Sequence, residues 1–306
     1  MRIPSRSLLS LILLALSFQS LPAWWDAGHM VVARIAYDKL KPDARKEADR
    51  LASVLARDYP HVNNFVAMAP WPDDLKESGV RAYDSWHYTN IPYNPYGIAL
   101  PTQPKVDVIW AIAQCQSILR SPHTADIEKA RFLAFLVHFV GDIHQPLHTT
   151  TMYLQSEPGG NLGGNTFKLK GSHSSLHKLW DDGCGFLSDY QDINPYGEDN
   201  EALNKDELNR LGKLAREITK AYPPKAIKNV TETDPDFWAL EGHKLAVRYG
   251  YRGVNGEQDG KTQYLLPGGT PSQVYLSRAQ EVVRERLAAG GYRLARILNS
   301  LLSPGE

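Results

Sequence analysis

The sequence contains only two cysteines, Cys115 and Cys184, among its 306 residues. Neither belongs to a CxxC motif, so the chain cannot build a zinc site from thiolates alone. In an exported protein, the two cysteines can instead form a disulfide that closes a long loop. The sequence leaves both states open, because it does not show whether the two Cα atoms come close enough to be bridged.

The chain also lacks a net charge, with 34 Lys and Arg residues against 34 Asp and Glu residues. A protein that binds duplex nucleic acid mainly by neutralising phosphates is usually much more basic. A polyanionic ligand therefore has to find its positive charge in one place on this chain. A bound metal ion is one way to supply that charge.

Beyond the first 23 residues, no segment is long and apolar enough to span a membrane. Those 23 residues have the layout of a secretory signal peptide, with Arg2 and Arg6 before the apolar run Leu8–Phe18. We expect cleavage between Ala23 and Trp24, which would give Trp24 a free α-amino group; an uncleaved anchor is the alternative. The expected product is a secreted or periplasmic monomer with no stable membrane anchor.

Apolar residues at helical spacing dominate residues 24–306, which we interpret as a single, all-α domain with long loops. Two strand-like pieces, Thr166–Lys170 and Gln263–Leu266, would form at most a small β-hairpin. The last helix can kink or break at Gly290 and Gly291. The predicted helices are His29–Leu40, Asp43–Ala56, Val106–Leu119, Ile127–Val140, Asn200–Tyr222, Asp236–Tyr249 and Ser272–Leu302.

Histidines and aspartates recur at short spacings. His138 and Asp142 are four residues apart, which places them on one helix face, and His177 and Asp181 repeat this spacing. His148 follows six residues after Asp142. Imidazole and carboxylate are the usual nitrogen and oxygen ligands of zinc. A single pair of this kind is more often an ion pair or a hydrogen-bonded core histidine, so spacing alone leaves both interpretations open.

The ordered motifs WWDAGH, WPDDLK, WHYTN, HFVGDIHQPLH, GGN and LHKLWD resemble those of the zinc-dependent single-strand nucleases called type I, or S-one/P-one, nucleases. The resemblance runs from Trp24 to Asp181, and the block from His138 to His148 is its most specific part. It implies a helical fold like that of zinc-dependent phospholipase C, with three Zn²⁺ ions per chain. It further implies phosphodiester hydrolysis of single-stranded DNA and RNA and of 3′-nucleotides, with 5′-phosphate products.

The resemblance also implies how the ligands are divided among the three zinc ions. Asp142 would bridge two ions, and Trp24 would chelate one of them through its α-amino nitrogen and its carbonyl oxygen. Signal cleavage would then be a step in assembling the site. The first ion would be held by Asp73, His87, His138 and Asp142, the second by His148, His177 and Asp181, and the third by Trp24, His29 and Asp142.

Catalytic roles are expected for Asp73, Asp142 and Lys76. A hydroxide between the two ions linked by Asp142 would attack phosphorus, and Asp73 would orient it. Lys76 stands where the family often has a phosphate-binding arginine; lysine keeps the charge but loses the bidentate fork. Tyr88 matches an aromatic position associated with base stacking, which would favour unpaired bases. A solvated Lys76 and a core Tyr88 remain alternatives.

Other polar residues near the motifs are not expected to be ligands. His144 is interpreted as structural, Asp182 as a solvated or capping carboxylate, and His173 as a histidine without a spaced partner. The loop at 163–165 is expected to support the site. Two further functions remain open: a phospholipase C that acts on phospholipid head groups, and a secreted zinc-binding protein without catalysis.

Overall fold

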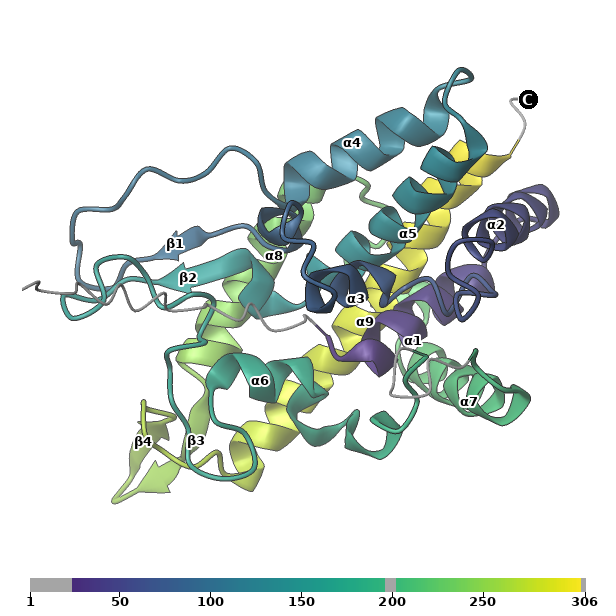
Figure 1. Cartoon of the computed structure of the whole chain (residues 1–306). Helices are drawn as coiled ribbons and strands as arrows, with labels where there is room; N and C mark the ends of the chain where they lie inside the picture. The colour runs from purple at the N-terminus through teal and green to yellow at the C-terminus, as the bar shows by residue number, and fades with distance from the viewer. Residues whose placement is uncertain (1–23, 196–201, 304–306) are drawn as a thin grey trace, which may run out of the picture.

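The computed structural model describes residues 24–195 and 202–303, and this part of the chain is mostly helical. Figure 1 shows the long helix α9 running through the middle of the molecule, with the other helices around it. The predicted signal peptide, residues 1–23, lies outside the described residues. The α-helices are α1 (Asp26–Tyr37), α2 (Pro42–Leu55), α3 (Trp71–Glu77), α4 (Val108–Arg120), α5 (Asp126–Asp142), α6 (Leu176–Asp181), α7 (Lys205–Ala221), α8 (Pro235–Leu245) and α9 (Gln273–Leu302).

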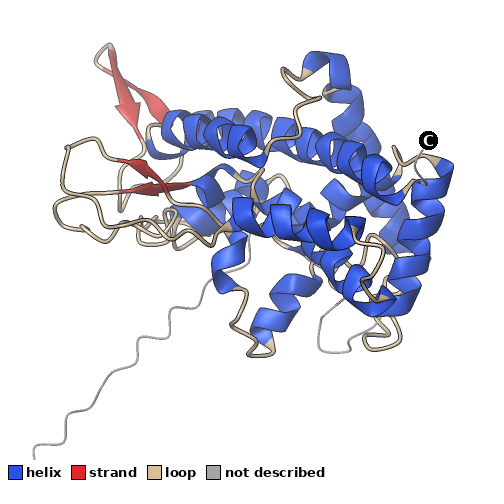
Figure 2. Cartoon of the chain, turned by 90° about the horizontal axis from the view of Figure 1, so that it is seen from above, coloured by secondary structure: helices blue, strands red, loops and turns tan. Residues whose placement is uncertain are grey.

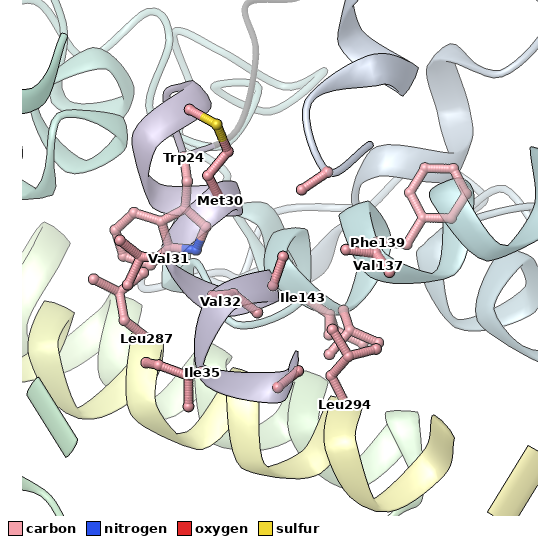
Figure 3. Packing of buried hydrophobic residues seen from close by; sticks show 14 of the residues in the cluster. Trp24, Met30, Val31, Val32, Ile35, Val137, Phe139, Ile143, Leu287 and Leu294 are labelled. Atoms are coloured by element: carbon pink, nitrogen blue, oxygen red, sulfur yellow. The ribbon is translucent and has the colours of Figure 1, made fainter. Parts of the chain in front are cut away.

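Helix α9 is continuous over 30 residues, so the break that the sequence allowed at its glycine pair does not occur. The glycines instead allow close packing of α1 on α9. A Cβ atom at Gly291 would lie 2.4 Å from Cγ2 of Ile35, so only a residue without a side chain fits there. Figure 3 shows Val32 and Ile35 of α1 facing Leu287 and Leu294 of α9 across this contact.

Helix α5, predicted over Ile127–Val140, lies at the centre of the fold, because its residues 133–142 are all buried. Helix α7 begins at a capping box in which Asn204 accepts from the N–H of Glu207 and the Glu207 carboxylate accepts from the N–H of Asn204. The predicted start at residue 200 lies outside the described residues. The α-helical part of α8 ends at Leu245, earlier than predicted, and a π-helical turn, Ala246–Tyr251, follows it directly.

Two small two-stranded sheets lie at one end of the helical body (Figure 2). Strands β3 (Val254–Gln258) and β4 (Lys261–Tyr264) form an antiparallel hairpin, which the sequence predicted only in its second strand. Strands β1 (Ile91–Tyr93) and β2 (Thr150–Met152) pair in parallel, which the sequence did not predict. The predicted strand at 166–170 contributes only one isolated bridge, between Lys168 and Ser175.

The two cysteines are both buried and unpaired, so the disulfide that the sequence left open does not form in this structure. Cys115 lies in α4, which packs on α5, whereas Cys184 lies in the 3₁₀ turn Gly183–Gly185, which packs on α9. Among the described residues, no helix is long and apolar enough to cross a membrane.

Candidate metal centre

All the histidine and aspartate side chains predicted as ligands converge where the start of α1, the end of α5 and several short elements meet. Each is buried, with at most 5% of its surface exposed. The short elements include two 3₁₀ turns, η1 (Asp84–His87) and η2 (Pro146–Thr149). The side chains are His29 from α1, Asp73 from α3, His87 from η1, His138 and Asp142 from α5, His148 from η2, and His177 and Asp181 from α6.

Two of these elements, α3 and α6, are short helices that the sequence did not predict as helices. Pro72 lies in the first turn of α3, where a missing N–H is tolerated, and Asp73 follows it in the same turn. Helix α6 begins at Ser175, whose hydroxyl accepts a backbone N–H of the first turn. This start places His177 and Asp181 one helical turn apart on the same face.

The first cluster is formed by His29, Asp73, His87, His138 and Asp142. Nδ1 of His87 and Nε2 of His138 lie 3.1 and 3.2 Å from Oδ2 of Asp142. The same two nitrogens lie 3.5 and 3.6 Å from the carboxylate of Asp73. On the other side of Asp142, Nε2 of His29 lies 3.6 Å from Oδ1. Two groups of ligand atoms in this cluster are each compact enough to hold one metal ion: His29, His138 and Asp142 form one, and Asp73, His87 and His138 form the other.

The second cluster consists of His148, His177 and Asp181, whose ligand atoms lie within 4.8 Å of one another. The structure thus brings together the same side chains that the resemblance grouped around a separate ion. Nε2 of His177 lies 3.6 Å from Oδ2 of Asp181. The Gln145 side chain donates to the other oxygen of Asp181 at 2.7 Å and fixes the orientation of this carboxylate.

Backbone carbonyls orient three of the imidazoles. His138, His148 and His177 each use Nδ1 to contact a carbonyl oxygen at 2.7 to 2.8 Å, which leaves Nε2 directed at the clusters. Such contacts are usual behind metal-bound histidines, because they fix the ring and raise the basicity of the ligand nitrogen. The three carbonyls belong to Ala69, His87 and Gly163.

The strongest sign that these clusters hold cations is the set of polar atoms that the protein leaves unpaired. In the described part of the chain, both oxygens of Asp142, both ring nitrogens of His29 and one ligand atom each of Asp73, His148 and Asp181 are buried without a hydrogen-bond partner. The two nitrogens nearest Asp142, Nδ1 of His87 and Nε2 of His138, contact each other at 3.0 Å. Because an unpaired buried polar group is costly, the residues fit a metal ion.

The electrostatics of the second cluster support the same conclusion. Burial, with help from His148, lowers the pKa of His177 to about 3, so this imidazole is neutral and able to bind a metal. Burial also raises the pKa of Asp181 well above its usual value, and the charges of Asp73 and Asp142 add to the shift. A carboxylate in this environment needs a nearby cation to stay ionised.

The first cluster is partly neutralised by the protein itself. Burial alone would raise the pKa of Asp73, but Lys76, His138 and His87 outweigh it and hold the pKa below its usual value. Nζ of Lys76 donates to Oδ1 of Asp73 at 3.0 Å, and this lysine is itself buried. The Lys76 ammonium is thus fixed beside the cluster. The alternative interpretation, a lysine free in solvent, does not agree with this position.

A pocket of about 570 Å³ opens onto the centre. His87, His148 and His177 reach into it from the ligand set, and Lys76 and Tyr88 line its wall. Among the wall residues that the sequence analysis missed is Leu162, which has a positive φ of 53° and a 43% exposed side chain. The sequence Gly163-Gly164-Asn165 indicated a loop next to Leu162, but it did not indicate that Leu162 lines the pocket.

The start of the described chain lies against the ligand-bearing helices. Trp24 is fully buried, and its indole N–H donates to the carbonyl of Gly141 at 3.0 Å, next to Asp142. The N–H of Trp25 donates to the carbonyl of Asp181 at 3.2 Å. The side chain of Trp24 and the backbone of Trp25 therefore contact the chain next to Asp142 and at Asp181, one ligand residue of each cluster.

The interpretation of Asp182 and His173 from sequence is wrong. Asp182 is fully buried, and Nε2 of His173 lies 3.1 Å from its Oδ2. Ser188 and Gln191 each donate to the Asp182 carboxylate at 2.8 Å. The His173 ring in turn lies 6.0 Å from the ring of Trp25. These two side chains hold the chain start in place instead of facing solvent.

Comparison with known proteins matches residues 24–303 to the sequence model described as S1/P1 Nuclease. Endonuclease 1 of Arabidopsis thaliana is 27% identical over 314 residues, covering 95% of this chain and 91% of the relative. Endonuclease 5 of the same plant is 28% identical, with 92% and 90% covered. Nuclease P1 of Penicillium citrinum is 29% identical over 169 residues, covering 52% of this chain and 57% of that protein.

The fold and the site define a helical protein with buried, adjoining His/Asp clusters that are consistent with metal binding. The chain belongs to the S1/P1 nuclease family. It is accordingly a nuclease, a hydrolase of phosphodiester bonds, as the resemblance implied.

Proposed function

We propose that this nuclease is a trinuclear zinc endonuclease and 3′-nucleotidase that hydrolyses single-stranded DNA and RNA to 5′-phosphate products. The observation that carries the metal part of this proposal is the set of buried ligand atoms without hydrogen-bond partners. The donors are imidazole nitrogens and carboxylate oxygens, the set that zinc prefers among nitrogen and oxygen ligands. The family supports the nucleic-acid substrate.

The ligands are proposed to divide among the three ions as the resemblance implies. Asp73, His87, His138 and Asp142 would hold one ion, and His148, His177 and Asp181 a second. The third would lie between His29, Asp142 and the backbone of Trp24. Zinc ions in these places supply charge that activates water and stabilises negative charge on the phosphate.

The chain's own residues would position the substrate. Lys76 fixes the carboxylate of Asp73 through its 3.0 Å contact and presents positive charge to the pocket, where a phosphate oxygen would bind. Asp73 would also orient the attacking nucleophile. Tyr88 lines the pocket beside His87 and offers a ring for stacking an unpaired base, which a duplex does not present.

Export is the second part of the proposal. Cleavage between Ala23 and Trp24 would leave residues 24–306 as one secreted or periplasmic nuclease domain. The match to the family begins at residue 24, which supports this boundary. Cleavage would also create the terminal amine that the Trp24 site requires.

A metal count and a substrate panel test the proposed activity. We expect three zinc ions per folded chain by mass spectrometry of the metal content, and turnover of single-stranded DNA and RNA above that of duplex DNA. Short-chain phosphatidylcholine belongs in the same panel. Hydrolysis of the lipid alone would refute the nuclease proposal in favour of a phospholipase C, and fewer than three ions would refute the trinuclear centre.

The terminal site is tested with two forms of the protein, one that begins at Trp24 and one with a single alanine ahead of it. The added residue turns the amine into an amide and removes a ligand, so the extended form is expected to bind two zinc ions and lose most of its activity. Equal zinc content and equal turnover in the two forms would contradict the terminal chelate while leaving the other two sites untouched.

A further inference from the structure

A second pocket adjoins the metal pocket on the other side of Tyr88. This pocket, which we call the α8 groove, has a volume of about 380 Å³ and lies between the segment 85–92, the segment 103–109 and helix α8. Tyr88 and Asn90 line both pockets, so the two pockets adjoin at these residues. The apolar part of its wall comes from Ile91, Val106, Ile109 and Leu240.

The two pockets differ in charge. Three lysines, Lys76, Lys168 and Lys178, line the metal pocket. Among the described residues that line the α8 groove there is no Lys, Arg or His, and its charged side chains are the carboxylates of Asp107 and Asp236. A phosphate group is repelled from such a groove, whereas a flat, uncharged group with N–H donors matches both its apolar wall and its acceptors.

The two carboxylates are available to a ligand. Oδ1 of Asp107 accepts the N–H of Trp110 and caps helix α4, but this leaves its second oxygen without a partner in the described chain. Asp236 forms no ion pair with any described residue, and partial burial together with Asp234 and Asp107 raises its pKa. Two neighbouring acceptors therefore face the groove without a cation between them.

We propose that the α8 groove binds a nucleobase of the single-stranded substrate, next to the nucleotide whose phosphate lies at the metal centre. The inference rests on the proposed nuclease activity and adds a binding site to it. Single-stranded nucleic acid alternates anionic phosphates with uncharged bases, so a strand that passes Tyr88 meets lysines on one side and an apolar, acidic groove on the other. A base reaches the groove only when it is unstacked, as in single strands.

The chemistry of the groove also predicts which bases it prefers. Cytosine, adenine and guanine carry exocyclic amino groups that donate to carboxylates, while thymine and uracil carry carbonyl oxygens at the corresponding edge. Asp107 and Asp236 therefore favour amino-bearing bases. The preference applies to DNA and RNA alike, because it depends on the base and not on the sugar.

The test compares Leu240→Ala in the groove with Leu266→Ala, a control on an exposed leucine that lines neither pocket. The readout is kcat/KM for a single-stranded oligonucleotide divided by kcat/KM for bis(4-nitrophenyl) phosphate, a phosphodiester without a base. We expect Leu240→Ala to lower this ratio about tenfold through lost apolar contact, and the control to keep it within about twofold. If the ratio is the same in Leu240→Ala and in the wild type, the proposal that the α8 groove binds a base is refuted.

A second variant, Asp107→Asn, tests the base preference, since asparagine still caps α4 but loses the charge. We expect the wild type to cleave oligo(dC) faster than oligo(dT), and the variant to reduce that preference. An undiminished preference would refute the role of Asp107. If the wild type cleaves neither phosphodiester, the proposed function fails; fluorescence anisotropy of the uncleaved oligonucleotide then tests the groove, and Leu240→Ala must weaken binding.

Discussion

Two largely buried polar clusters lie close to the end of α5, and they are stabilised in different ways. One is the metal centre. The other, which we call the arginine network, consists of His144, Glu241, Arg286 and Arg293. There, Arg293 donates to Glu241 at 2.7 Å and lies 3.0 Å from Nε2 of His144, while Arg286 donates to the same carboxylate at 2.8 Å. Nδ1 of His144 contacts the carbonyl of Val140.

The comparison shows that burial alone does not mark a ligand. His29 in the metal centre and His144 in the arginine network are both fully buried. In the arginine network the protein itself pairs the carboxylate and the imidazole, and only one guanidinium nitrogen each of Arg286 and Arg293 lacks a partner. In the metal centre both oxygens of Asp142 and both ring nitrogens of His29 lack partners among the described residues, which favours binding of a cation from outside the chain.

The largest effect is expected from Asp142, whose carboxylate lies near His29 through one oxygen and near His87 and His138 through the other. Asp142→Asn keeps the shape but removes the charge, and we expect turnover of a single-stranded oligonucleotide to fall by about 10³-fold. Zinc content should fall as well. His144→Gln, two residues away in the arginine network, is the matched control and should keep its zinc. Full zinc content and activity in Asp142→Asn would refute the role of this carboxylate.

Metal removal should destabilise the protein because the first cluster then keeps buried charges that are only partly paired. A ligand present at about 1,000 times its dissociation constant stabilises the folded state by about 4 kcal/mol. For a domain of this size, that corresponds to a Tm lower by about 10 °C after dialysis against a chelator. Differential scanning calorimetry with and without zinc provides the measurement. An unchanged Tm would mean that the unpaired atoms do not bind the metal.

The arginine network should affect the stability of the protein without affecting its zinc content. Glu241→Gln leaves two buried guanidinium groups without their carboxylate, and breaking a buried ion pair in this way costs about 3 kcal/mol. We expect a lower free energy of unfolding at unchanged zinc content, measured by urea denaturation of the zinc-loaded protein. Loss of zinc in this variant would show that the arginine network and the metal centre are coupled, and that they are not stabilised independently.

The sequence predicted the parts of this site that depend on local patterns. Helix α5 carries a strong apolar pattern, and His138 and Asp142 stand one turn apart on it, so their proximity follows from helical geometry. The assignment of His29 and Trp24 to the site came from the resemblance alone. The helical fold followed from periodicity over several long segments.

What the sequence did not predict depends on contacts between distant segments. Helices α3 and α6 have seven and six residues, too short for a periodic pattern. The strands β1 and β2 have three residues each and pair across the intervening helices, so neither carries an alternating signal. Asp182 is buried because Ser188, Gln191 and His173 fold around it. Spacing to neighbouring residues carries no information about such partners.

The smallest effect is expected from His173, which contacts the chain start but no ligand atom. Its imidazole is held by Asp182 at 3.1 Å and lies against Trp25, whose N–H contacts the carbonyl of Asp181. His173→Ala should make the position of Trp25 less fixed and so lower the zinc affinity of the Trp24 site by about tenfold. This is the lower end of the range for residues that hydrogen-bond or support metal ligands. Activity at saturating zinc should change less, because the ligands themselves remain.

The measurement is zinc occupancy at increasing concentrations of a competing chelator, with His123→Ala as the control because His123 is exposed and far from these contacts in sequence. One ion should leave His173→Ala at a lower chelator concentration than in the control, while the other two leave at unchanged concentrations. Selective loss of a single ion separates a local effect on the chain start from general destabilisation, which would release all three together. Identical release curves for the two variants would show that Trp24 stays in place without the support of His173.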